Sequence, residues 1–162
     1  MIKILLFDTV HTQDVINLIL PIQQIEFNVP ITLDMQPDLL QIPAIYQQGR
    51  GSFWVALHGD EVVGTIGLID IGKGQACLRK MFVKATFRGK AFNIGQQLLE
   101  VVLDWCRAQQ VHEIYLGTRE DLHAARRFYE RNGFFPVAKS ELPANFPLMS
   151  VDSHFYGYRV IG

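Results

Sequence analysis

The sequence has few cysteines, little net charge and no long apolar run. Only Cys77 and Cys106 occur, with no Cys-x-x-Cys pair, so a cytoplasmic protein with reduced thiols is expected. The net charge of −1 disfavours a general nucleic-acid binder, because such proteins carry a basic excess. No apolar run is long enough to span a bilayer, and the N-terminus turns acidic at Asp8, too early for a signal peptide. Neither nucleic acid nor a membrane is therefore an expected partner.

Several common binding motifs are also missing. The five histidines show no ligand spacing such as His-Glu-x-x-His, so no metal site is predicted. The chain has no Gly-Lys-Ser/Thr ending of a nucleotide P-loop and no Gly-x-Gly-x-x-Gly dinucleotide fingerprint. A nucleotide P-loop and a dinucleotide-binding fold, two common alternatives, are thereby disfavoured.

The composition and the hydrophobic pattern predict one globular α+β domain over residues 1–162. Apolar residues make up 49% of the chain and charged residues 19%, which is typical of a folded protein with its own core. Strands are predicted at residues 2–7, 53–57, 62–69, 75–83, 113–117 and 155–161. A hairpin is predicted at residues 58–61, and Gly72-Lys73-Gly74 predicts a second turn.

The helical segments follow from periodicity and from capping residues. A helix is expected to begin at Thr12 and to kink or end at Pro21, and short, broken helices are expected over residues 34–48. The clearest helix spans residues 93–110. The run Thr118-Arg119-Glu120-Asp121 resembles a capping box that starts a last helix, with Leu122, Ala125, Phe128 and Tyr129 inward and Gly133 at its end.

A basic turn leads directly into the clearest helix. Arg88-Gly89-Lys90 follows the apolar strand at 75–83, and the helix begins a few residues later. The first amides of a helix lack internal partners, and the helix dipole adds positive charge at the same end. The segment therefore predicts an anion site, with phosphate as the expected anion.

Three elements together resemble the GNAT superfamily of acetyl-CoA-dependent N-acetyltransferases. The segment Lys90-Ala91-Phe92-Asn93-Ile94-Gly95, followed by Leu98-Leu99, is similar to that family's pyrophosphate loop, Gln/Arg-x-x-Gly-x-Gly/Ala. An apolar strand precedes the loop, and Phe128-Tyr129-Glu130-Arg131-Asn132-Gly133-Phe134 is similar to the family's Phe/Leu-Tyr-x-x-x-Gly-Phe ending. The resemblance implies a mostly antiparallel sheet with a splayed parallel strand pair, flanked by about four helices.

The chain departs from the family pattern at three positions. Lys90 stands for Gln or Arg, which keeps a donor but loses the planar fork. Asn93 stands for the first glycine, and asparagine is among the non-glycine residues that best tolerate positive φ. Leu122 stands where the family often has Asn. None of these changes removes a backbone amide of the loop.

The resemblance also implies the roles of individual residues. Acetyl-CoA would be the co-substrate, and Tyr129 would protonate the departing thiolate. A backbone N–H near Phe82 or Val83 would stabilise the tetrahedral intermediate. The residues expected to bind the cofactor are Met81, Phe82, Val83, Arg88, Gly89, Lys90, Ala91, Phe92, Asn93, Ile94, Gly95 and Gln96.

The acceptor and its general base are less specified by the sequence. Glu26, Asp70, Asp152 and His154 are candidate bases by residue type, and Glu26 ranks first because acceptors dock near its segment in the family. The acceptor would be a small-molecule amine or a peptide amine. Exposed apolar residues in the tail are compatible with a homodimer.

Each interpretation has an alternative. Arg88 and Lys90 are also compatible with solvated turn charges, Tyr129 with a core residue and Glu26 with a surface carboxylate. A CoA-binding regulatory or sensor module without turnover is the second functional hypothesis, and a purely structural α+β domain is the third. Turnover with an amine distinguishes the first hypothesis from the second, and stabilisation by CoA distinguishes both from the third.

Overall fold

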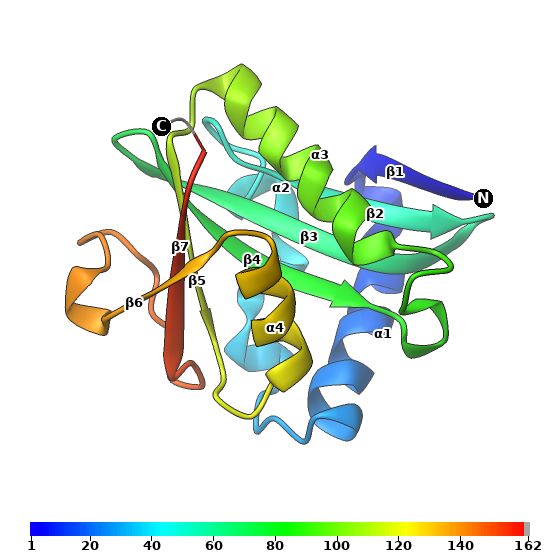
Figure 1. Ribbon diagram of the computed structural model, residues 1–162. Coiled ribbons are helices and arrows are strands. Elements are labelled where there is room, and N and C mark those ends of the chain that lie inside the picture. The colour runs from blue at the N-terminus through cyan, green and yellow to red at the C-terminus, as the bar shows by residue number, and fades with distance from the viewer. Residues whose placement is uncertain (161–162) are drawn as a thin grey trace.

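The computed structural model describes residues 1–160, which build a seven-stranded mixed sheet (Figure 1). The strands lie in the order β1-β2-β3-β4-β5-β7-β6, and all neighbouring pairs are antiparallel except β4 and β5. Their bounds are β1 Ile2–Leu6, β2 Ser52–His58, β3 Glu61–Gly72, β4 Gln75–Val83, β5 Glu113–Thr118, β6 Phe135–Val137 and β7 His154–Arg159. The predicted fold class, a mostly antiparallel sheet with one parallel pair, is confirmed.

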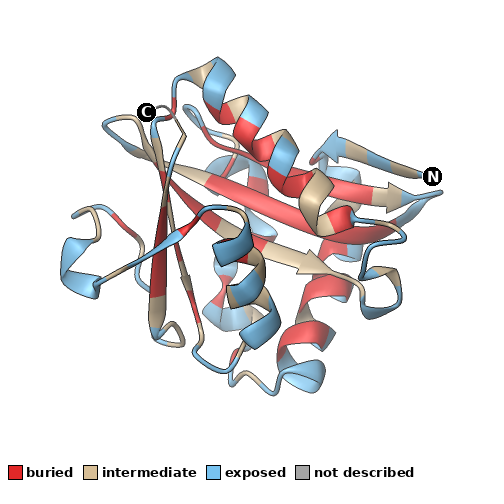
Figure 2. Cartoon of the chain, viewed as in Figure 1, coloured by how far each residue is buried: buried red, intermediate tan, exposed pale blue. Residues whose placement is uncertain are grey.

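Helices cover both faces of this sheet. On one face lie α1 (Thr12–Pro21) and α2 (Ile42–Ile45), and on the other lie α3 (Ile94–Gln109) and α4 (His123–Arg131) (Figure 1). Alternate residues of a strand point to opposite faces, so β2 places Trp54 and Ala56 in the core under α3 and Phe53 and Val55 in the core under α1. The central strands are consequently buried on both sides (Figure 2).

The predicted turns and broken helices are confirmed. The β2–β3 connection falls at residues 59–60, and Gly72, Lys73 and Gly74 all have positive φ in the β3–β4 turn. Residues 33–45 form two 3₁₀ turns, Leu33–Met35 and Pro37–Leu40, and the short helix α2. The regular part of α1 ends at Pro21, and the chain continues as a π-helical turn, Ile22–Glu26.

The predicted start of the last helix is wrong. Thr118 is the final residue of β5, where it pairs with His154 of β7, and α4 begins only at His123 with Leu122 at the N-cap position. Arg119 and Asp121 bind each other in the intervening turn, so Asp121 does not close a capping box. Of the four inward residues, Tyr129 is buried and Leu122, Ala125 and Phe128 are half-buried. The last strand ends at Arg159, and Ile161, its predicted end, lies outside the described residues.

Candidate active site

The two parallel strands of the sheet separate along their length. β4 pairs with β5 only from Gln75 to Cys77, opposite Glu113 to Tyr115, and the remaining residues of the two strands have no partners on this side. A cavity of about 170 Å³ lies where they diverge, and residues 77–82 and 117–119 contribute to its wall. The inner edge of β4 beyond Cys77 is therefore free to pair with an extended ligand.

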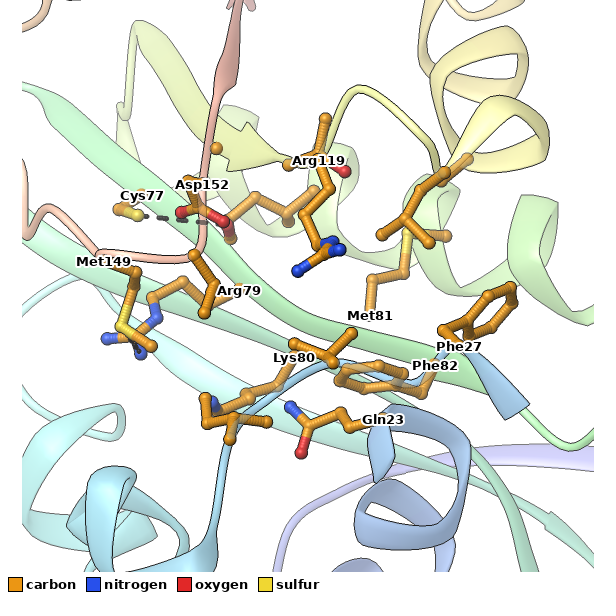
Figure 3. A pocket seen from close by; sticks show the side chains of 18 of the residues that line it. Gln23, Phe27, Cys77, Arg79, Lys80, Met81, Phe82, Arg119, Met149 and Asp152 are labelled. Atoms are coloured by element: carbon orange, nitrogen blue, oxygen red, sulfur yellow. Dashed lines mark hydrogen bonds between the residues drawn. The ribbon is translucent and has the colours of Figure 1, made fainter. Parts of the chain in front are cut away.

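A β-bulge turns β4 at the point where it leaves β5. The register against β3 shifts between Thr65 and Gly67, and Lys80 adopts a left-handed φ of 55°. The buried Thr65 hydroxyl donates a hydrogen bond of 2.7 Å to the Lys80 carbonyl and so supports this strained backbone. Beyond the bulge, Met81 and Phe82 line the cavity and Val83 continues the strand (Figure 3).

The turn before α3 has the conformation that its sequence predicts. Gly89 has a φ of 104°, and Asn93, at the N-cap position, has a φ of 54°. Within residues 1–160, no carbonyl accepts a hydrogen bond from the amides of Lys90, Ala91 and Phe92, nor from those of Ile94, Gly95 and Gln96. The loop therefore presents two groups of unused N–H donors at the positive end of a helix of 16 residues, as an anion site requires.

The structure directs Arg88 away from this loop. Its Nη1 and Nη2 donate to the two oxygens of Glu26, the second over 2.8 Å, and its Nε donates to the Val83 carbonyl over 2.8 Å. These bonds from Arg88 hold the pKa of the Glu26 carboxyl below its usual range. Glu26 also lies outside the wall of the β4–β5 cavity. A carboxylate paired in this way is a weak base, so the geometry favours another residue for proton transfer.

Tyr129 and Asp152 lie on the wall of the cavity. Tyr129 comes from α4 and is 9% exposed. Burial raises its pKa above the ordinary value, and the Asp152 carboxylate adds to this rise, so the hydroxyl keeps its proton at neutral pH. Burial also raises the pKa of Asp152 to about 6, although Arg79 and Lys80 oppose the rise.

Asp152 is positioned by the end of β5. The Ser153 amide donates to the Thr118 carbonyl over 2.8 Å, and the Asp152 amide donates to the Met149 carbonyl over 3.1 Å. A side chain at position 117 would collide with the Asp152 carboxylate, so only glycine leaves room for it there. The end of the segment between β6 and β7 (residues 138–153, the tail segment) is thereby held against the cavity.

The other two candidate bases lie elsewhere. Asp70, in β3, accepts hydrogen bonds from the Arg50 and Gly72 amides over 2.9 and 2.8 Å and caps two turns. His154 begins β7, where its Nδ1 lies 3.2 Å from the Ser153 hydroxyl. Neither residue lines the β4–β5 cavity.

A buried charged cluster, which sequence reasoning missed, adjoins the cavity through Arg79 and Lys80, which are part of its wall. Asp38 accepts a hydrogen bond of 2.6 Å from the Tyr46 hydroxyl and lies 3.7 Å from Lys80 Nζ and 3.9 Å from Arg79 Nη2. Lys80 Nζ donates to Gln36 Oε1 over 2.6 Å, and burial lowers the pKa of Lys80 to about 8. Two adjacent cations in an apolar strand were the available signal, because strict alternation would turn at least one of them into a covered face of the sheet. The bulge at Lys80 instead brings both side chains to Asp38.

No three His, Cys, Asp or Glu side chains within residues 1–160 are grouped so as to hold a metal ion. None of the helices in this part of the chain has the length and hydropathy of a membrane-spanning segment.

Comparison with known proteins identifies the family. The model of the acetyltransferase (GNAT) family matches residues 16–134, so the chain belongs to that family. A solved GNAT acetyltransferase from Staphylococcus aureus Mu50 is 38% identical, with a TM-score of 0.96 over 99% of this chain and 100% of that one.

Other relatives match a smaller part of the chain or share only its fold. N-acetyltransferase family 8 member 2 from Rattus norvegicus is 31% identical over 62% of this chain and 46% of its own length. The chain spans about half the length of the curated relatives that it matches first. The PaiA N-acetyltransferase of Thermoplasma acidophilum, solved in complex with coenzyme A, is 15% identical with a TM-score of 0.74 over 98% of this chain and 99% of that one, which shows a shared fold.

Proposed function

We propose that this protein is an acyltransferase that moves the acetyl group of acetyl-CoA to a primary amine by direct attack. The observation that carries the proposal is the free edge of β4 beside the unpartnered amides at the start of α3. The two amides of pantetheine fit an unpaired strand edge, and the pyrophosphate fits the N–H groups of residues 90–96. The coenzyme A complex of PaiA, which shares the fold, supports this choice of ligand.

The residues on the cavity wall supply the proton transfers. The neutral amine attacks the acetyl carbonyl carbon, a C–N bond forms, and the thioester C–S bond breaks. A backbone amide of Phe82 or Val83 stabilises the oxyanion. Asp152 takes the amine proton, directly or through one water, and the Tyr129 hydroxyl protonates the departing thiolate. The Asp152 proton then returns through solvent to Tyr129, so the products are an N-acetyl amide and free CoA.

Asp152, and not Glu26, is the proposed base, because Asp152 lines the cavity and has the higher pKa. Its pKa of about 6 leaves it ionised at neutral pH, yet makes it a stronger base than an ordinary carboxylate. Glu26, with its pKa lowered by Arg88, is a weaker base and lies outside the cavity wall. We assign Glu26 a structural role instead. Its ion pair with Arg88 links the turn that follows α1 to the start of the loop before α3.

Thiol release from acetyl-CoA in a panel of primary amines tests the proposal. We expect acetyl-CoA to raise the melting temperature and at least one amine to accelerate thiol release, with the acetylated product identified by mass spectrometry. Stabilisation by CoA without turnover on any amine would favour a CoA-binding module. The absence of any stabilisation would favour a purely structural domain.

Replacing Glu26 by Gln tests the assignment of the base. We expect kcat to change less than about threefold, because Glu26 lies outside the cavity. The unfolding free energy should fall by less than about 1 kcal/mol, since both side chains of the Arg88 pair are about one third exposed. Steady-state rates and urea unfolding measure the two effects, and a loss of kcat of about 100-fold would restore Glu26 as the base.

Replacing Asn93 by Gly tests the loop. Glycine adopts a φ of 54° without strain, so we expect stability to rise by a few tenths of a kcal/mol and CoA to bind at least as tightly. Asn93→Val is the opposite change, because a β-branched residue is strained at positive φ. We expect this variant to bind CoA about tenfold more weakly. Calorimetric titration with CoA measures both variants, and unchanged affinity in Asn93→Val would mean that this loop does not bind the pyrophosphate.

A further inference from the structure

The Arg79 guanidinium is enclosed in the cavity without a strong hydrogen-bond acceptor. Its side chain is 16% exposed, and its one hydrogen bond within residues 1–160 runs from Nη2 to the thioether sulfur of Met149 over 3.1 Å. Thioether sulfur is a weak acceptor, whereas a guanidinium carries five N–H donors in a planar fork that matches a carboxylate. An enclosed cation of this kind is most stable when an anion completes its shell.

The neighbouring carboxylate does not meet this need. Asp38 lies 3.9 Å from Arg79 Nη2, beyond hydrogen-bond distance, and the oxygen nearest to Arg79 already accepts a bond of 2.6 Å from the Tyr46 hydroxyl. Asp38 also lies 3.7 Å from the Lys80 ammonium, so its one negative charge faces two cations. Asp38 thus leaves the N–H donors of Arg79 without a carboxylate in hydrogen-bond contact.

The opposite charge lies on the tail segment. Asp152 and Arg79 both line the cavity, from the tail and from β4 respectively (Figure 3). Arg119 reaches in from the end of β5, but Nε and Nη2 of Arg119 each donate to an oxygen of Asp121 over 3.1 Å, which balances its charge. The cavity therefore presents the Asp152 carboxylate for an amine and, on another part of its wall, a guanidinium that has no strong hydrogen-bond acceptor within residues 1–160.

We propose that the acceptor amine also carries a carboxylate, which Arg79 binds in a bidentate manner, so that the acceptor is an amino acid or a related small amino-carboxylate. This inference rests on the proposed function and names the substrate class of the same site. The amine lies toward Asp152 and the carboxylate toward Arg79, and each charge of the acceptor meets its opposite. The cavity volume of about 170 Å³ suits a small molecule of this kind.

Matched sets of acceptors test the inference with the unmodified protein. Each set holds an amino acid, its carboxamide and the amine without the carboxyl group, and the panel covers the common L-amino acids, β-alanine and 4-aminobutyrate. We expect the best acceptor to be an amino acid, with kcat/KM at least about 100-fold above that of its carboxamide, because the amide leaves the guanidinium unpaired. Equal or faster acetylation of carboxamides or plain amines would overturn the inference.

Variants at Arg79 assign the effect to this residue. Arg79→Gln should reduce the preference for acid over carboxamide to below about tenfold, chiefly through the acceptor KM, with the KM of acetyl-CoA unchanged. Arg79→Lys keeps the charge without the fork and should give an intermediate ratio. Arg107→Gln, on the exposed face of α3, is the matched control and should leave the ratio unchanged. If Arg79→Gln keeps the preference for the acid over the carboxamide, Arg79 does not bind the acceptor carboxylate and only contacts Met149.

The two proposals fail in different ways. If acetyl-CoA releases thiol with no amine, the proposed function fails, whether or not CoA stabilises the protein. If plain amines are acetylated as well as the amino acids are, the function stands and the inference about the carboxylate fails. If other amines are acetylated but no amino-carboxylate is, the function again stands and the inference is overturned.

Discussion

Tyr129→Phe is expected to lower kcat about 100-fold while leaving the affinity for acetyl-CoA unchanged. The hydroxyl lies on the cavity wall and keeps its proton at neutral pH, because burial and then Asp152 raise the pKa of Tyr129. The ring packs against Phe134 and Tyr156, with centroids 5.6 and 6.0 Å away, so phenylalanine fills the same space. Only the proton donor is lost.

Steady-state thiol release and calorimetric titration with CoA separate these two quantities. Tyr158→Phe is the matched control, because this half-buried ring packs on Phe134 and does not line the cavity. We expect the control to retain the parental kcat. An unchanged kcat in Tyr129→Phe would show that the hydroxyl protonates no leaving group and that Tyr129 is a core residue alone.

Asp152→Asn is expected to lower kcat/KM about 100-fold and to change its dependence on pH. In the parent, the rate should fall below about pH 6, because the pKa of Asp152 is about 6 and the protonated acid cannot accept a proton from the amine. The amide does not titrate, so the variant should lose this acidic limb. A pH–rate profile that keeps a limb near pH 6 in the variant would assign the titration to another group.

The same substitution should stabilise the fold at neutral pH. Because the folded-state pKa of about 6 lies above the ordinary 3.8, the contribution of Asp152 to stability is complete below about pH 4 and is lost as the pH rises through 6. At pH 7 the amide avoids this cost, so we expect Asp152→Asn to raise the unfolding free energy by about 3 kcal/mol. Urea unfolding at pH 7 and pH 4 measures it, and the difference should vanish at the lower pH.

Most of the fold could be predicted from the sequence, because local propensity and tertiary burial favour the same structure in most elements. In the helix at 94–109, the apolar periodicity and the burial of one face favour the same structure. The same holds for the turns that connect β2, β3 and β4, where glycine adopts positive φ. The capping-box motif at Thr118 failed because Thr118 is buried and pairs in β5, and a sheet partner outweighs a local cap. Local sequence carries no information about that pairing.

The loop of the candidate site was predictable, whereas the buried charged cluster beside the cavity was not. The left-handed Asn93 follows from the tolerance of asparagine for positive φ. The meeting of Asp38, Arg79 and Lys80 depends on a bulge at Lys80, a residue type with no preference for positive φ, and on a 3₁₀ turn far away in the sequence. Asp152 was recognisable only as one of several carboxylates, because its burial is created by tertiary contacts with the end of β5.

Hydrogen–deuterium exchange in the presence and absence of saturating acetyl-CoA tests the central claim most directly. The amides of Ile94, Gly95 and Gln96 donate to no carbonyl within residues 1–160, so they should exchange rapidly in the free protein. We predict that acetyl-CoA slows exchange in peptides covering residues 90–96 and 81–83, while the outer strand β1 is unaffected. Unchanged exchange in both segments, at a ligand concentration where calorimetry shows saturation, would contradict the assignment of this site.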